Sequence, residues 1–275
     1  MGWFSSKQPL PLISPRLVCE FLLYMFNLGS SSSSLNSMRS AINFFTLNKF
    51  DLDNNIFIKR IFKYFYRERP LKCKYSSFWD VEKLIDFLKT WHPMTSLSLK
   101  QLTLKTIALI ALSSSDRGQT LHLASTGSME ILPDKVIFVI RERVKNTRKT
   151  LKPTIINCPV SDVESLNVAA YVKYYIDVTN DFREEGGQLF ISWASKSPVS
   201  KQSLARWLTQ ILSMAGIDTN TFKAHSFRGA GLTKAYQRGA SLEQIVEAGN
   251  WSSSSTFKRF YFAPSIPSVG SLILQ

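Results

Sequence analysis

The segment from Ser98 to Ser115, SLKQLTLKTIALIALSSS, restricts the fold of this chain more than any other segment. Its apolar residues nearly encircle a helix, and a helix that is apolar on all sides has to be buried. Ser98 can cap the first turn, because a serine hydroxyl accepts hydrogen bonds from the free backbone N–H groups there. We therefore expect a central helix with other elements packed around it. Asp116 and Arg117 follow its end directly, and this is an unusual place for an arginine.

The residues before Pro70 predict a separate, all-helical unit. Three stretches with helical periodicity lie there, namely 14–27, 35–47 and 54–66. The first has Ser14 as its cap and Pro15 in its first turn, where a proline costs no hydrogen bond. In the second stretch, the side chains that we expect to be buried are Ala41, Ile42, Phe44 and Phe45.

The last of these helices and the connector after it are strongly basic. Between residues 59 and 74, Glu68 is the single acid. The basic residues there are Lys59, Arg60, Lys63, Arg67, Arg69, Lys72 and Lys74. A charge run is commonly a solvated surface, but one of a single sign favours contact with a phosphate backbone. Pro70 ends the helix, so we expect a domain boundary just beyond it. The two expected domains are 1–73 and 74–275.

The second domain is expected to be mostly α, with a small antiparallel β-sheet. Segment 135–140, KVIFVI, and a shorter one ending at Asn157 are typical of strands. A basic hairpin between them carries Lys145, Arg148, Lys149 and Lys152. Further helices are expected at 80–88, 162–177 and 200–215, and three short ones at the end, the last containing Tyr261.

Composition restricts the partners and the compartment. The net charge of +14 favours a polyanion, nucleic acid before an acidic membrane. The three cysteines are far apart and odd in number, so they predict neither a disulfide framework nor a zinc site, and a reducing interior is expected. No apolar run approaches the ~20 residues of a membrane helix, and the N-terminus does not resemble a secretory signal. We expect an intracellular protein without a membrane partner.

The segment from Ala224 to Tyr261 holds the residues that could carry chemistry. His225 and Arg228 are three apart and would share one face of a helix's first turn. An arginine there is best explained by an anion shared with the helix dipole, although a capping histidine and a surface arginine are an alternative. The small residues 229–231 favour close approach by another backbone. Trp251 and Tyr261 could equally be core aromatics.

Rival chemistries find little support in the sequence. His92 and His122 make no metal motif with the cysteines, and no glycine-rich phosphate loop is present. Asp116 and Glu130 do not amount to the acidic cluster of a two-metal nuclease. We therefore expect neither metal nor cofactor, and a transition state stabilised by cationic side chains.

These segments resemble the tyrosine recombinase (phage integrase) family, and most closely the branch in eukaryotic mobile elements of the DIRS and Crypton type. AHSFRGAG looks like the His-x-x-Arg box of the family, and GNWSSSSTFKRFY like its terminal Trp-to-Tyr box. LSSSDRGQTLHL looks like the first-arginine box, and VKNTRKT stands where the family has its hairpin lysine. The likeness covers nearly the whole chain.

The resemblance implies an active site with Tyr261 as the nucleophile. The residues that match the family's catalytic set are Arg117, Lys145, His225, Arg228, Trp251 and Tyr261. Lys149 is the rival of Lys145, and Arg148 and Lys149 would contact DNA. Many relatives have an acid three residues after the first arginine, where this chain has Thr120, so the orientation of Arg117 is left open.

The implied function is site-specific recombination, integration or transposition for a mobile element. The helical N-terminal domain would clamp double-stranded DNA, and the protein would act in the nucleus as a tetramer on two DNA sites. Cleavage would pass through a 3′-phosphotyrosyl intermediate. Two alternatives remain: a DNA-binding protein that has lost catalysis, and a type IB topoisomerase that relaxes supercoils with a similar residue set.

Overall fold

The computed structural model describes residues 13–47, 49–70, 77–142, 153–251 and 253–260. The chain divides into two compact units, Met1–Lys72 and Cys73–Gln275. The expected boundary between residues 73 and 74 falls in segment 71–76, which is outside the described residues. Among the described helices, none is long and apolar enough to cross a membrane.

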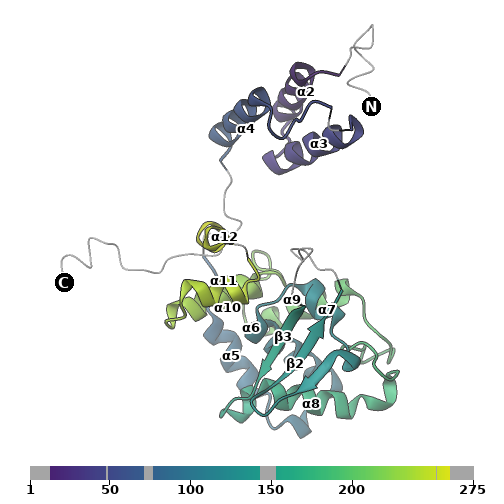
Figure 1. Ribbon diagram of the computed structural model, residues 1–275. Helices are drawn as coiled ribbons and strands as arrows, with labels where there is room; N and C mark the ends of the chain where they lie inside the picture. The colour runs from purple at the N-terminus through teal and green to yellow at the C-terminus, as the bar shows by residue number, and fades with distance from the viewer. Residues whose placement is uncertain (1–12, 48, 71–76, 143–152, 252, 261–275) are drawn as a thin grey trace, which may run out of the picture. The chain divides into compact units, whose positions relative to one another are not determined.

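In the described part of the first unit, three helices surround a small apolar core (Figure 1). They are α2 (Pro15–Asn27), α3 (Ser32–Phe45) and α4 (Ile56–Glu68). Ser14 caps α2 by accepting a hydrogen bond from the Leu17 backbone N–H, with Pro15 at the first helical position, as the sequence predicts. The fully buried core residues are Val18, Leu22, Phe26, Leu35, Leu52, Ile58, Phe62 and Phe65.

The expectation for the second helix was wrong in two respects. The helix begins earlier, at Ser32, because the Ser31 side chain accepts from the Ser34 backbone N–H and caps it there. Phe44 and Phe45 are 73% and 81% exposed. The inward face of α3 instead carries Leu35, Met38, Ile42 and Asn43, and Phe44 points to the opposite side. Phe45 repeats the spacing of Met38 and Ile42, but it is the last residue of the helix and stays uncovered there. Ala41 is exposed too.

The second unit is mostly helical with one three-stranded antiparallel sheet, as expected. Its longer helices are α5 (Val81–Thr90), α6 (Leu99–Ser114), α8 (Val168–Val178), α9 (Lys201–Met214) and α10 (Ser226–Gln237). The shorter ones are α7 (Gly118–Leu123), α11 (Leu242–Ala248) and α12 (Ser254–Phe260), with 3₁₀ turns η1 (Met94–Ser96), η2 (Thr126–Ser128), η3 (Glu164–Leu166) and η4 (Asn180–Phe182). The strands are β1 (Met129–Ile131), β2 (Lys135–Ile140) and β3 (Thr154–Pro159).

The sheet has the strand order β1-β2-β3, and β2 pairs with β3 over its full length. In that register Val136 lies opposite Cys158 and Phe138 lies opposite Ile156, and all four side chains are buried. The strand β1 was not expected, because three residues with only partial burial leave too short an alternating pattern to recognise.

Helix α6 is the centre of this unit. It contacts α8, α9, α10 and strand β3, and every residue from Leu102 to Ala111 is buried. Ser98 and Gln101 form a reciprocal capping box at its start, which satisfies free N–H groups of the first turn. The prediction of a central helix buried on all sides is therefore confirmed.

One of the buried residues of α6 is a lysine. The Lys105 ammonium group donates to the Trp91 backbone oxygen at 2.6 Å and to the Tyr171 hydroxyl at 2.8 Å. The Tyr171 hydroxyl in turn donates to the same Trp91 oxygen at 3.1 Å. Burial lowers the pKa of Lys105 to about 8 and raises the pKa of Tyr171 to about 12. This polar group fixes α6, α8 and the end of α5 in one arrangement.

We predict that the free energy of unfolding of the wild type rises with pH in the alkaline range, and that Lys105→Met abolishes this rise. Between pH 8 and the ordinary lysine pKa near 10.5, the unfolded chain binds the proton that folded Lys105 has released. The free energy of unfolding of the wild type therefore rises with pH over this range. Chemical denaturation at a series of pH values measures it, with Lys100→Met, an exposed lysine on the same helix, as control. Equal slopes for both variants would contradict the prediction.

Candidate functional site

A cavity of about 540 Å³ lies in the second unit, among the end of α6, α7, α9 and the start of α10. It is strongly cationic. The charged or titratable residues that line it are Asp116, Arg117, Lys201, Lys223, His225 and Arg228. Three residues of the expected catalytic set, Arg117, His225 and Arg228, are thus brought together from segments more than a hundred positions apart. Such a cavity suits a small anionic group.

The end of α6 directs Arg117 into the cavity. Ser115 follows the helix in the left-handed conformation with φ of 52°, which stops the helix and turns the chain. Arg117 then has an extended backbone and immediately precedes α7. The unusual position of this arginine after a buried helix therefore has a structural reason: the turn at Ser115 takes the chain from the core to the cavity wall.

Two neighbouring contacts fix the start of α10. The Ser226 hydroxyl accepts a 2.8 Å hydrogen bond from the Trp79 indole N–H, and the Phe227 ring packs edge-on against the Trp79 ring at 5.4 Å. Both residues are buried, so the first turn of α10 is held against the core. His225, just before this turn, remains exposed at the cavity, whereas Arg228 is 5% exposed.

The Arg228 guanidinium connects three segments. One Nη donates to the Ser115 backbone oxygen at 3.1 Å, and the other donates to the Gly249 backbone oxygen. Its Cζ lies 4.7 Å from the centre of the Trp251 ring. Trp251 is therefore a neighbour of Arg228, although it does not itself line the cavity.

The small residues after Arg228 allow close packing, as the sequence predicts. A Cβ at Gly231 would lie 3.2 Å from the Leu112 backbone oxygen and 3.1 Å from the Ser115 hydroxyl. A Cβ at Gly229 would overlap the Phe78 ring. The absence of a side chain at Gly231 lets α10 approach the end of α6, so that Arg228 can reach the Ser115 backbone oxygen. The absence of a side chain at Gly229 makes room for Phe78.

An acid that the sequence analysis set aside belongs to this cavity. Burial raises the pKa of Asp116 to about 6. Three interactions act to lower this pKa: the charge of Arg228, a hydrogen bond with Ser114, and the charge of Arg117. Behind it, burial and the Asp116 charge raise the pKa of Cys158 on β3 to about 12. Lys201 and Lys223 were also missed, because neither belongs to a recognisable motif. The only signal for Asp116 was its position next to Arg117.

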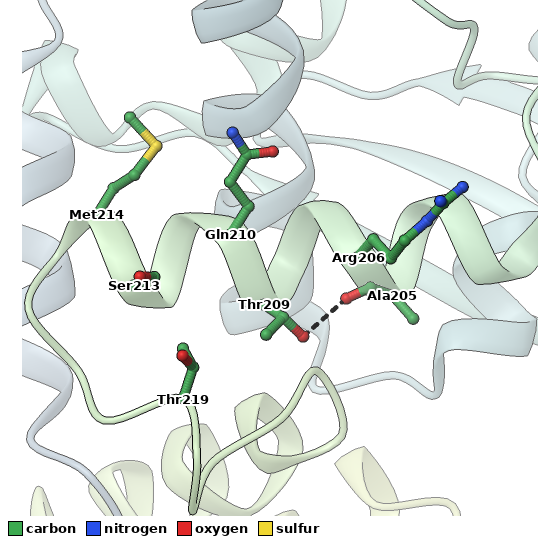
Figure 2. Close-up of a pocket in the computed structure, with 7 residues that line it drawn as sticks. All are labelled: Ala205, Arg206, Thr209, Gln210, Ser213, Met214 and Thr219. Atoms are coloured by element: carbon green, nitrogen blue, oxygen red, sulfur yellow. Dashed lines mark hydrogen bonds between the residues drawn. The ribbon is translucent and has the colours of Figure 1, made fainter.

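A second hollow of about 500 Å³ adjoins the cavity along α9 (Figure 2). It shares Ala205 and Thr209 with the cavity and is further lined by Arg206, Gln210, Ser213, Met214 and Thr219. Figure 2 shows Arg206 and Gln210 projecting from the same helix. The hollowed surface therefore continues from the cavity along α9, where it carries Arg206 and Gln210.

Several expected site residues lie outside the described residues. They are Lys72, Lys74, Lys145, Arg148, Lys149 and Tyr261. The convergence of the lysine and the tyrosine on the cavity thus stays a prediction. Within the described ranges, no group of three or more His, Cys, Asp or Glu side chains is placed to hold a metal ion.

The basic residues of the first unit differ from one another in their surroundings. Lys59, Lys63 and Arg67 recur at intervals of four on the exposed side of α4. Arg60 is exposed as well. Arg69 is different, because its guanidinium donates to the backbone oxygens of Phe26 and Ser30 at 2.5 and 3.4 Å and covers the Phe26 ring. It closes the end of α2, so part of its hydrogen-bonding capacity is used within the unit.

Comparison with known proteins gives a family match and a set of similar folds. A model described as "Phage integrase family" matches residues 77–265. A search of curated proteins finds no match. The solved structure of the XerH site-specific recombinase bound to palindromic difH substrate is 15% identical with a TM-score of 0.61, covering 93% of this chain and 70% of that chain.

Two further solved structures have the same fold. The Tn1549 transposon integrase in complex with transposon right-end DNA is 11% identical with a TM-score of 0.62, covering 99% of this chain and 90% of that one. A lambda integrase dimer bound to a COC′ core site is 13% identical with a TM-score of 0.55, covering 94% and 67%. Because the family model matches well over half of its residues, this chain belongs to the phage integrase family of tyrosine recombinases.

Proposed function

We propose that the protein is a site-specific DNA recombinase that breaks and rejoins DNA through a 3′-phosphotyrosyl bond at Tyr261. The observation that carries the proposal is the convergence of Arg117, His225 and Arg228 on one cationic cavity. Membership of the phage integrase family and the net charge of +14 support the same reading. The resemblance of the motifs to DIRS- and Crypton-type elements suggests a mobile element as the source.

Arg117 and Arg228 would bind the two non-bridging oxygens of the reacting phosphate. Each guanidinium carries five N–H donors in a planar fork that matches phosphate oxygens, and Arg228 uses two of its donors to hold backbone oxygens. Negative charge on these oxygens grows in the transition state, and donors placed in advance stabilise it. Trp251 acts through Arg228, because its ring contact keeps the guanidinium in place.

The remaining groups would move protons. Tyr261 Oη forms a bond to phosphorus as the bond from phosphorus to the 5′ oxygen breaks. His225, exposed at the cavity, would accept the tyrosine proton. Lys145 would protonate the leaving 5′ oxygen, with Lys149 as the alternative, since an arginine does not release its proton. The ester bond is exchanged rather than hydrolysed, so rejoining is the same step in reverse.

The DNA would also contact basic and polar residues outside the cavity, in each of the two units. Arg206 and Gln210 on α9 adjoin the cavity, and the row of Lys59, Lys63 and Arg67 on α4 offers contacts to phosphates in the first unit. We further propose that two such sites are paired within a tetramer and that the protein acts in the nucleus. These proposals follow from the family resemblance.

We predict that the wild type forms an SDS-resistant adduct with a nicked suicide duplex, on sites selected from a random pool for binding. In this substrate the cleaved strand cannot be rejoined, so the covalent intermediate accumulates. Tyr261→Phe should bind the same DNA without an adduct, while Tyr174→Phe on α8 should keep it. Binding without an adduct in the wild type would favour the inactive DNA-binding alternative. Relaxation of supercoils without strand exchange between two sites would favour the topoisomerase.

We predict that Lys145→Ala slows cleavage by ~10²–10⁴, the usual contribution of a general acid. A duplex with sulfur in place of the bridging 5′ oxygen should restore the rate, because a thiolate leaves without being protonated. Gel-resolved cleavage rates measure both effects. Lys149→Ala should change little, and Arg117→Ala should remain slow on the sulfur substrate. If Lys149→Ala is slow and the sulfur substrate restores its rate, Lys149 rather than Lys145 protonates the leaving 5′ oxygen.

We predict that Lys59→Gln and Lys63→Gln each weaken DNA binding uniformly across sequences. Each should reduce the slope of log K against log salt concentration by about 1, because one fewer counterion is released. Fluorescence anisotropy at several salt concentrations measures the slope. Lys173→Gln, at an exposed lysine of α8, is the matched control. Slopes equal to that of the control would exclude α4 from the DNA contact.

A further inference from the structure

We propose that Asp116 is a positioning residue that holds the two arginines of the cavity in their working orientation. The inference rests on the proposed function and adds a residue that the expected catalytic set does not include. Thr120, where many relatives have an acid, is 2% exposed and neutral in this chain. Of the described residues that line the cavity, Asp116 is the one acid.

Asp116 is flanked along the chain by the residue that binds Arg228 and by Arg117. The residue before it, Ser115, accepts the Arg228 hydrogen bond on its backbone oxygen, and the residue after it is Arg117. Its backbone N–H donates to the Ser114 hydroxyl at 3.2 Å, which fixes the backbone at this turn. Both arginines favour its ionised form, so both guanidinium groups lie within electrostatic reach of the carboxylate.

The other charged or titratable groups near Asp116 come from three parts of the chain. Lys201 lies at the start of α9, Lys223 and His225 lie just before α10, and Cys158 on β3 lies behind the cavity wall. The thiol of Cys158 is neutral, because burial and the carboxylate raise its pKa to about 12. The carboxylate therefore faces cations on the cavity side and an uncharged wall on the other.

The Asp116 carboxylate can reduce charge repulsion in the cavity and orient the arginines. Without DNA, the cations that line the cavity repel one another, and a carboxylate between two guanidinium groups reduces that repulsion. It also accepts hydrogen bonds in fixed directions, so it can hold an arginine fork before the phosphate arrives. Since the pKa of Asp116 is raised to about 6, the carboxyl is ionised at neutral pH and protonated in mild acid. The arginines should therefore lose this support as the pH falls below 6.

The first test compares adduct formation by the wild type, Asp116→Asn and Asp116→Glu between pH 5 and 8. The wild-type rate should fall through about pH 6, and Asp116→Asn should be roughly tenfold slower at pH 7.5, less than the loss of a direct donor. Asp116→Glu should recover part of the rate. Asp134→Asn, an exposed acid of the same unit, is the matched control. DNA affinity should be unchanged throughout.

The loss of rate in mild acid must be assigned to Asp116 or to His225, because histidine side chains in general change charge in this pH range. If protonation of Asp116 causes the loss of rate, Asp116→Asn no longer slows as the pH falls, and its rate of adduct formation varies little between pH 5.5 and 7. If the rate of this variant still falls in mild acid and its rate at pH 7.5 equals that of the wild type, the inference is overturned. An equal loss of rate at every pH, without rescue by Glu, would also overturn it and indicate a purely structural residue.

A second test does not depend on recombination. The Arg117 side-chain Nε–H signal in ¹H–¹⁵N spectra is assigned with Arg117→Lys and followed between pH 5 and 8. It should shift with a midpoint near 6 in the wild type, and this midpoint should disappear in Asp116→Asn. A midpoint that persists in the variant overturns the inference. If the wild type forms no Tyr261-dependent adduct at all, the proposed function fails, and this spectrum still decides whether Asp116 controls the arginine.

Discussion

The candidate site depends on one buried guanidinium. Arg228 joins the end of α6 to the turn after α11, through hydrogen bonds to the backbone oxygens of Ser115 and Gly249, and its face contacts the Trp251 ring. Burying a cation costs free energy unless its donors are used, and backbone oxygens supply acceptors without adding an opposite charge. Arg228 therefore remains a cation at the cavity wall, in electrostatic reach of the Asp116 carboxyl, and can attract an anion.

The same contact couples the site to the core. Helix α6 is buried from Leu102 to Ala111, and the hydrogen bonds of Lys105 with Trp91 and Tyr171 fix its first half. The turn at Ser115 then ends the helix in a single conformation, from which Asp116 and Arg117 emerge. A rigid core helix thus sets the position of the cavity residues, because close packing leaves it few alternative positions.

Sequence patterns predicted where helices begin more accurately than which of their side chains are buried. Capping residues such as Ser14, Ser98 and Asp80 marked helix starts correctly, because a cap satisfies backbone N–H groups locally. Phe44 and Phe45 were wrongly expected in the core, since periodicity cannot show which residues of a last helical turn still face a neighbour. Asp116 was set aside because a lone acid has no local pattern. Its surroundings come from α10, α9 and β3, far away in the sequence.

The sequence by itself determined that the second unit has a helix buried on all sides, because no other environment accommodates so many apolar residues around one axis. It also determined the identities of Arg117, His225 and Arg228 as candidate site residues, through spacing within short segments. Only the tertiary structure decided that these residues share one cavity, that Arg69 closes a helix end, and that the acid Asp116 lines the same cavity as the arginines. The physical reason is that charge acts through space, whereas motifs record only neighbours along the chain.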